Sequence, residues 1–322
     1  MNNKEETQSL SIKILSVFGG VLASLAFLAF FSITGLYDSN IGLLVFGITC
    51  IVGAILISKV FDKIIIDTIS ISFFIVGFIL LFIGLKITNN LIYVIFIAIA
   101  FSSLMIVRNY ILSFVSILII NGSILALIIF NEGYNLIHLY VSCLTLIVSY
   151  WFLKEAKIIT TNKVLSKLYN PIRIGLIFSF ISGMTFLGKK GMLPMSPGYI
   201  WLSSGVIIPA IMYLISVLFD ILNITKIRHK TVIYIFTVLT LLPTAFSPAI
   251  PGAVLIILLS FLVNHKTGLA LGIIAFIYFI SQYYYDLNFT LLTKSILLFS
   301  SGVLFIILYL FTRKKSTANE KI

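Results

Sequence analysis

The residues best suited to chemistry in this chain gather in one stretch, SQYYYDLNFTLLTKS, at residues 281–295. It contains three consecutive tyrosines, including Tyr284 and Tyr285, and then Asp286 and Asn288. Successive residues turn by about 100° around a helix, so the tyrosines cannot all face one ligand. We expect them to form an aromatic band at a membrane surface, with Asp286 or Asn288 capping a final helix.

Lys294 is the exception in this stretch. It lies roughly one turn inside the expected final helix, at the end of the helix dipole that disfavours a cation. One interpretation is that its side chain extends to Asp286 or to water. The other is that it contacts an anionic partner or a lipid headgroup, which makes Lys294, Asp286, Tyr284 and Tyr285 candidate partner-contacting residues.

Few other ionisable side chains fall within apolar segments. Asp62 and Asp67 are at the start of one expected helix and Asp220 is near the end of another, so we interpret all three as structural. His138 is near one end of an expected helix. A lone histidine there more often bonds to a neighbouring helix than acts as a ligand or base, but it is retained as a candidate functional residue.

Common catalytic sequence motifs are missing from the sequence. It has no HExxH, GxSxG or P-loop lysine motif, and no two carboxylates fall within helical reach of each other inside an apolar segment. Its two cysteines, Cys50 and Cys143, have no CxxC spacing. We therefore expect no enzyme activity, no cofactor and no metal site, and a proton- or sodium-coupled transporter is disfavoured.

The composition indicates a membrane protein. The chain has 322 residues, of which 60% are hydrophobic and 10% charged, and its mean hydropathy is +1.18. Soluble domains carry about 25% charged residues. The net charge of +12 does not indicate nucleic-acid binding, because the basic residues lie in short segments between apolar runs.

Apolar runs of roughly 20 residues predict an all-α integral membrane protein with about twelve transmembrane helices. The expected spans are residues 13–36, 40–58, 65–85, 91–107, 110–130, 134–153, 173–188, 198–222, 231–246, 249–264, 268–285 and 291–312. With the N-terminus inside, 18 of the 22 basic residues fall on the cytoplasmic side. The sequence therefore predicts that the N-terminus and the C-terminus are both cytoplasmic.

Residues 154–172 form the longest expected cytoplasmic connection. Apolar residues recur there at helical spacing beside several lysines, which predicts a basic amphipathic helix on the membrane surface, ended by Asn170 and Pro171. The segment separates possible halves at 1–153 and 173–322. Because the halves show no residue-level similarity, we interpret 1–322 as a single polytopic membrane domain.

Two proline-rich segments, 187–201 and 242–252, fall on the outer side. Their irregular backbone could line an outward-facing vestibule, or the prolines could simply end helices. Trp151 and Trp201 are expected at opposite membrane interfaces.

The C-terminal sequence resembles a family of bacterial multi-pass inner-membrane proteins catalogued as domain of unknown function 4401. The shared pattern comprises Tyr284, Tyr285, Leu287, Thr290, Leu291, Leu292, Lys294, Ser295, Ser301 and Gly302. The resemblance implies a small membrane-anchored protein as a partner, besides the lipid bilayer. It implies no activity, cofactor or catalytic residue.

These observations lead to three functional hypotheses. The first is a non-catalytic subunit or scaffold of a complex in the cytoplasmic membrane, with its outer loops facing a partner. The second is a carrier or flippase for a neutral or lipid-like substrate, and the third is a membrane-embedded enzyme that acts on a lipid. A filled core with an apolar flank would favour the subunit, and a deep polar cavity would favour the carrier.

Overall fold

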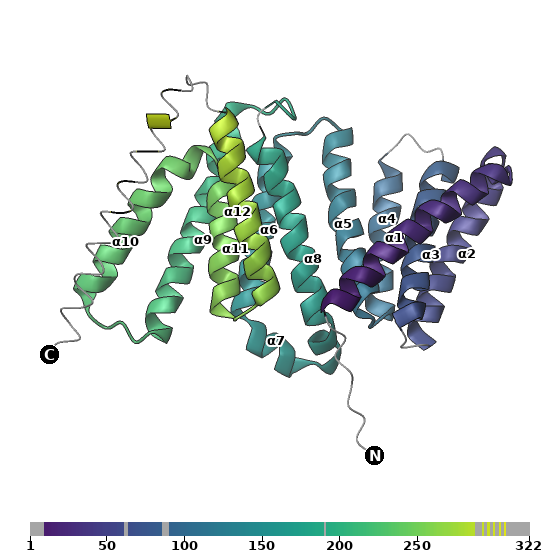
Figure 1. Ribbon diagram of the computed structural model, residues 1–322, viewed down its shortest axis with the longest axis horizontal. Helices are drawn as coiled ribbons and strands as arrows, with labels where there is room; N and C mark the ends of the chain where they lie inside the picture. The colour runs from purple at the N-terminus through teal and green to yellow at the C-terminus, as the bar shows by residue number, and fades with distance from the viewer. Residues whose placement is uncertain are drawn as a thin grey trace, which may run out of the picture.

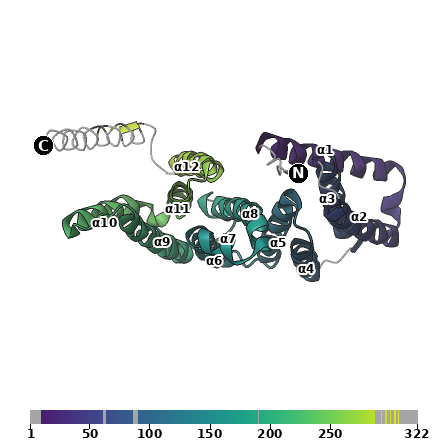
Figure 2. The same cartoon turned by 90° about the horizontal axis from the view of Figure 1, so that it is seen from below.

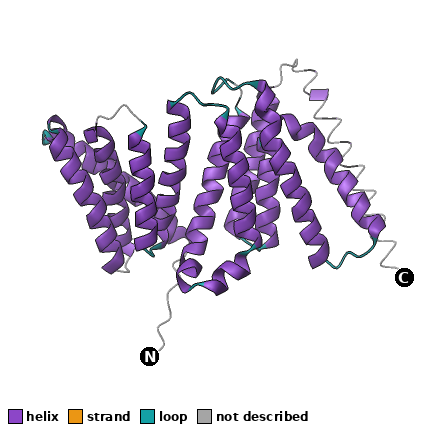
Figure 3. Cartoon of the chain, turned by 180° about the vertical axis from the view of Figure 1, so that it is seen from behind, coloured by secondary structure: helices purple, strands orange, loops and turns teal. Residues whose placement is uncertain are grey.

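The computed structural model describes residues 10–60, 64–85, 90–189 and 191–286, with a few single positions between 292 and 306. All regular structure in these residues is helical (Figure 3). The α-helices are α1 (Leu10–Ile33), α2 (Asn40–Val60), α3 (Ile64–Leu85), α4 (Leu91–Ile106), α5 (Tyr110–Phe130), α6 (Leu136–Leu153), α7 (Glu155–Thr161), α8 (Lys163–Gly188), α9 (Ile200–Ile221), α10 (Ile227–Leu241), α11 (Ala249–Leu262) and α12 (Lys266–Asp286). Short 3-10 helices occupy Leu36–Asp38 (η1), Pro197–Tyr199 (η2) and Leu242–Phe246 (η3).

Every α-helix of the described residues except α7 runs in the opposite direction to the long helix before it (Figure 1). Eight helical segments in this part of the chain are long and apolar enough to cross a bilayer, and three shorter apolar helices accompany them. A helix occupies each of the first eleven expected spans. The twelfth, 291–312, lies mostly outside the described residues.

The short helix α7 lies across one side of the molecule (Figure 1). We call this side the α7 end, and we call the side that carries residues 189–199 and 242–248 the opposite end. Seen along the helices, the molecule is an elongated row with α8 near its middle (Figure 2). Packing of α5 against α8 joins the helices α1–α5 to the rest.

The prediction for residues 154–172 was wrong in its boundaries. Only Glu155–Thr161 forms a separate surface helix, and α8 starts at Lys163, where the Asn162 side chain accepts a hydrogen bond from Val164 N at 2.8 Å. Pro171 lies inside α8 and is buried. A proline removes one helical hydrogen bond, but burial of the surrounding helix face compensates, so α8 continues through it to Gly188.

The helices α2 and α3 pack closely against each other. A Cβ atom added to Gly77 would lie 2.5 Å from Ile51 Cγ1 and 2.8 Å from the backbone oxygen of Gly47. Only a residue without a side chain fits such an approach, which brings the two backbones together as small residues do in membrane helix pairs.

The proline-rich segments pack onto the helices beneath them. Asn135 accepts a hydrogen bond from Ser196 N at 3.0 Å, and the Ser204 hydroxyl donates to Ala245 O at 2.6 Å. Pro248 and Pro251 are buried at the start of α11. These contacts agree with prolines that end and begin helices.

Candidate functional site

A buried arginine is the centre of the polar groups at the α7 end. Arg173 belongs to α8 and is 5% exposed. Its Nη1 is 3.1 Å from Glu155 Oε1 in α7, and its Nη2 donates to Asn170 Oδ1 at 2.6 Å. A buried cation is costly unless it is paired, so Glu155 and Asn170 fix both its charge and its position.

Aromatic rings complete the surroundings of Arg173. The guanidinium carbon is 4.8 Å from the ring centre of Tyr169 and 5.5 Å from that of Phe152, distances typical of cation–π contacts. Tyr169 also stacks on Trp151, with ring centres 5.8 Å apart. Two further hydrogen bonds join this pair, from Trp151 Nε1 to Tyr169 O and from the Tyr169 hydroxyl to Trp151 O. The end of α6, α7 and the first half of α8 are therefore held as one unit.

His265, in the connection between α11 and α12, lies beside this unit. Its ring centre is 6.4 Å from that of Phe152, and its Nδ1 accepts a hydrogen bond from Gly268 N at 3.0 Å. The ring proton is therefore on Nε2. Burial, and to a smaller extent the positive charge of Arg173, together lower the pKa of His265 to about 4.

This shift predicts a loss of stability in acid. The unfolded chain takes up a proton at His265 as the pH falls below about 6.5, whereas the folded chain does so only near pH 4. Between these values the free energy of unfolding should fall by up to about 1.4 kcal/mol per pH unit. Thermal unfolding of the purified protein in detergent at pH 7 and pH 5 measures this loss of stability.

The matched variants are His265→Gln and His229→Gln. His265→Gln keeps a neutral polar side chain and should remove this part of the acid sensitivity. His229 is exposed near the start of α10, so His229→Gln should retain it. Equal acid sensitivity in wild type and His265→Gln would contradict the prediction.

A second buried charge lies at the same end, in the helices α1–α5. Asp67 is in the first turn of α3 and is 4% exposed. Its Oδ1 accepts a hydrogen bond from Asn109 Nδ2 at 2.5 Å. Asn109 Oδ1 in turn accepts from Ile111 N at 2.9 Å and so caps α5.

Tyr110, the residue after Asn109, lies near Arg173, the first of the two buried charges. Tyr110 lies close enough to Arg173 for the two groups to interact electrostatically. The N-terminus of α5 therefore contacts Asp67 on one side and approaches Arg173 on the other. We call Asp67, Asn109, Tyr110, Arg173, Glu155, Asn170 and His265 the polar belt of the α7 end.

The belt is suited to holding helices together. In the described part of the chain no histidine bonds to a carboxylate, and no group of three metal-binding side chains occurs. The sequence did not single out Arg173, Glu155, Asn109 or His265. Arg173 was counted with the surface bases because it follows the predicted end of a loop, and its only distinguishing signal was its place in an apolar run.

His138, which the sequence proposed as a candidate, lies at the opposite end. It is 2% exposed, and its Nδ1 is 3.0 Å from Ser203 Oγ in α9. The expected hydrogen bond to a neighbouring helix is therefore present. The Ser203 hydroxyl also lies 3.2 Å from Ile200 O, and His138 Nε2 is buried without a hydrogen-bond partner among the described residues.

The remaining candidates belong to or follow α12. Tyr284, Tyr285 and Asp286 form its last turn, with the two tyrosine rings 5.8 Å apart. Gln282 Nε2 donates to Asp286 Oδ1 at 3.1 Å. No hydrogen bond or ring contact that we find in the described residues joins this turn to His138, and Lys294 lies outside them.

Trp151 and Trp201 lie at opposite ends of the molecule, as expected.

The fold and the polar belt define a class: an all-helical protein with eight helical segments suited to crossing a membrane among its described residues. The chain belongs to the family described as a domain of unknown function, DUF4401, whose model matches residues 9–315. The resemblance noted at the C-terminus thus extends over nearly the whole chain. Comparisons with curated proteins and with solved structures found no match.

Proposed function

We propose that this protein is a non-catalytic subunit or scaffold of a complex in the bacterial cytoplasmic membrane. It crosses the bilayer about twelve times, and both termini are cytoplasmic. The observation that carries the proposal is α10: within the part of the chain that the structure describes, only 6% of its apolar stretch is buried. By contrast, the helices around α8 are closely packed and their buried charges are paired within the chain. A filled interior beside an apolar flank suits association with another membrane protein better than passage of a solute.

The charges at the two ends support the proposed orientation. Exposed basic side chains gather at the α7 end, whereas Lys189 is the exposed base that the described residues place at the opposite end. Cytoplasmic loops carry an excess of Lys and Arg, so the α7 end faces the cytoplasm in this proposal. The bases at the α7 end are Lys59, Arg108, Lys154, Lys157, Lys163, Lys167, Lys226, Arg228 and Lys266.

Purification of the native protein in a mild detergent tests the proposal. We expect a stoichiometric partner with a membrane anchor to copurify. Lys294→Gln should reduce its recovery several-fold while expression is unchanged, because the lysine would contact an anionic group of that partner. Lys266→Gln, at the α7 end, is the control and should retain the partner. Absence of any stoichiometric partner would refute the proposed role as a subunit.

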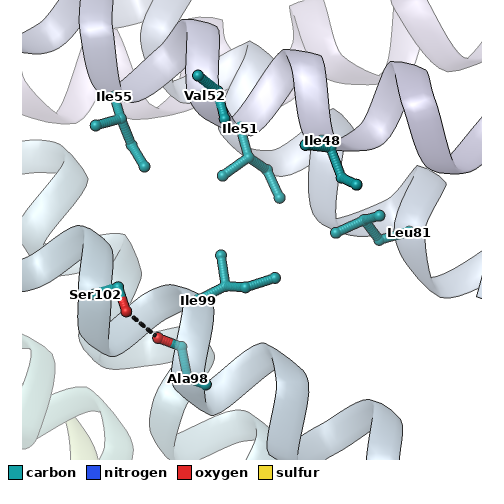
Figure 4. A pocket seen from close by; sticks show the side chains of 8 residues that line it. All are labelled: Ile48, Ile51, Val52, Ile55, Leu81, Ala98, Ile99 and Ser102. Carbon is teal, nitrogen blue, oxygen red and sulfur yellow. Dashed lines mark hydrogen bonds between the residues drawn. The ribbon is translucent and has the colours of Figure 1, made fainter.

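A carrier or flippase for a lipid-like substrate is the second candidate, and one observation favours it. An open groove of about 300 Å³ lies on the surface between α2, α3 and α4 (Figure 4). The one hydroxyl that lines the groove, that of Ser102, already donates to Ala98 O at 2.8 Å, so the groove suits an acyl chain rather than a polar solute. Lipid transport by the purified protein in vesicles, without a partner, would favour this function. The lining residues are Ile48, Ile51, Val52, Ile55, Leu81, Ala98, Ile99 and Ser102.

A further inference from the structure

The two walls of the open groove are formed by α2 and α4, and α3 contributes Leu81 (Figure 4). Both walls run toward the α7 end (Figure 1). Apolar side chains of the α2 wall are open to the surroundings: Ile48 is 54% exposed and Val52 is 47% exposed. In a bilayer such an opening is filled by an apolar chain, because an empty gap loses the contacts of the atoms that line it.

The α2 wall ends in a lysine. Ile48, Val52 and Ile55 follow each other at spacings of four and three residues, so they form one stripe along the helix. Lys59 is the next position of this stripe, four residues beyond Ile55 and still within α2. Its side chain is exposed, so a flexible positive charge lies at the α7 end of the groove.

The α4 wall is followed by a second base. Helix α4 stops at Ile106, and Val107 has an extended backbone and is buried in the same cluster as Ile51 of α2. Neighbouring side chains of an extended segment point in opposite directions, so Arg108 faces outward, and it is exposed. We find no ion pair between Lys59 or Arg108 and the residues that the structure describes.

The charges at the two ends of these walls differ in sign. At the opposite end, α2 begins at Asn40, two residues after the exposed Asp38, and α4 begins after Asn90. In the described residues those ends therefore carry an acid, whereas the α7 ends carry two bases. Asp67, in the first turn of α3, is 4% exposed and does not offer its carboxylate to the surface. An anionic headgroup is therefore attracted to the α7 end of the groove and repelled at its other end.

We infer that the groove holds an anionic phospholipid of the cytoplasmic leaflet, with one acyl chain between α2 and α4 and its phosphate bound by Lys59 and Arg108. Lysine and arginine both bind phosphate, and arginine can donate two parallel hydrogen bonds to it. Basic sites between transmembrane helices on the cytoplasmic side are typical places for such headgroups. The choice of leaflet rests on the proposed orientation, but the site suits a subunit as well as a carrier.

Thermal unfolding of the purified full-length protein tests this site. The detergent micelles contain an equal mole fraction of phosphatidylglycerol or phosphatidylcholine with identical acyl chains, so that only the headgroup differs. We expect phosphatidylglycerol to raise the wild-type midpoint by on the order of 2–4 °C relative to phosphatidylcholine. The double variant Lys59→Gln with Arg108→Gln should lose most of this difference. Ala98→Phe should lose it too, because the ring would fill the groove.

Lys226→Gln with Arg228→Gln is the matched control. Both bases are exposed at the α7 end, but they lie at the start of α10, far along the row of helices from α2 (Figure 2). The control removes the same charge and should keep the difference between the two lipids. Equal wild-type midpoints in the two lipids, or an equal loss in the control, would overturn the site.

Ala98→Phe distinguishes the groove from the membrane surface. A lipid difference that this variant keeps would mean that the headgroup binds without the groove, which overturns the inference. Loss of a copurifying membrane partner in this variant would show that the groove holds a helix of that partner instead of a lipid. Otherwise the variants of the groove should retain any partner of the native protein, so failure of the lipid site is distinguishable from failure of the proposed role as a subunit.

Discussion

Glu155→Gln is expected to lower the free energy of unfolding by about 2–3 kcal/mol. The substitution removes the carboxylate that pairs with Arg173 and leaves the guanidinium buried without a counter-charge. Breaking a fully buried pair costs about 3–5 kcal/mol. The smaller value is expected here because the Glu155 side chain is 28% exposed, so water can partly replace it. Chemical or thermal unfolding of the purified protein in detergent measures the change.

Glu132→Gln is the control for this prediction. Glu132 is exposed in the connection between α5 and α6, so its loss should change the stability by less than about 0.5 kcal/mol. A double variant, Glu155→Gln with Arg173→Met, removes both charges and should recover most of the loss. If Glu155→Gln is as stable as Glu132→Gln, the pair does not hold α7 against α8.

Gly77→Ala is expected to destabilise the protein by about 1–3 kcal/mol. The new methyl group would lie 2.5 Å from Ile51 Cγ1 and 2.8 Å from the backbone oxygen of Gly47. The Ile51 side chain can rotate, but the backbone oxygen can only move if α2 moves away from α3. Separation of α2 from α3 should lower the midpoint of thermal unfolding.

Gly53→Ala provides the comparison on the facing helix. A Cβ atom there meets no atom within 4 Å, so the substitution gains helix propensity without a clash. It should leave the stability unchanged or raise it by up to about 1 kcal/mol. A Gly77→Ala protein with the stability of Gly53→Ala would show that α2 and α3 are not in close contact at this point.

The helices themselves were largely predictable from the sequence. Lipid offers no hydrogen-bond partners, so each apolar run of sufficient length must satisfy its backbone within its own helix. Both the apolar run and the hydrogen bonds that satisfy its backbone are local. Hydropathy therefore located the eleven long helices of the described residues, and most of their ends are within a few residues of the predicted ones. The failure at 154–172 has a tertiary cause: Pro171 would end an isolated helix, but burial within the bundle keeps it inside α8.

The polar belt could be predicted only in part. Asp67 was recognised as a charge at a helix start, but its burial depends on Asn109, which lies 42 residues away in the chain. Arg173 looked like one more basic residue of a cytoplasmic loop. Its burial follows from α7 folding back over α8, which brings Glu155 to it. His138 was placed correctly as a bonding partner between helices, although the sequence could not show that Ser203 is its partner.

The sequence by itself determined that this chain is a membrane protein, where its helices run and where its basic residues concentrate. The tertiary structure decided which helix faces contact each other, and so which charges and hydroxyls are buried together. The physical reason is that lipid is as apolar as the side chains that pack helices together. Hydropathy therefore cannot distinguish a face that contacts lipid from one that contacts Gly77, Asp67 or Arg173.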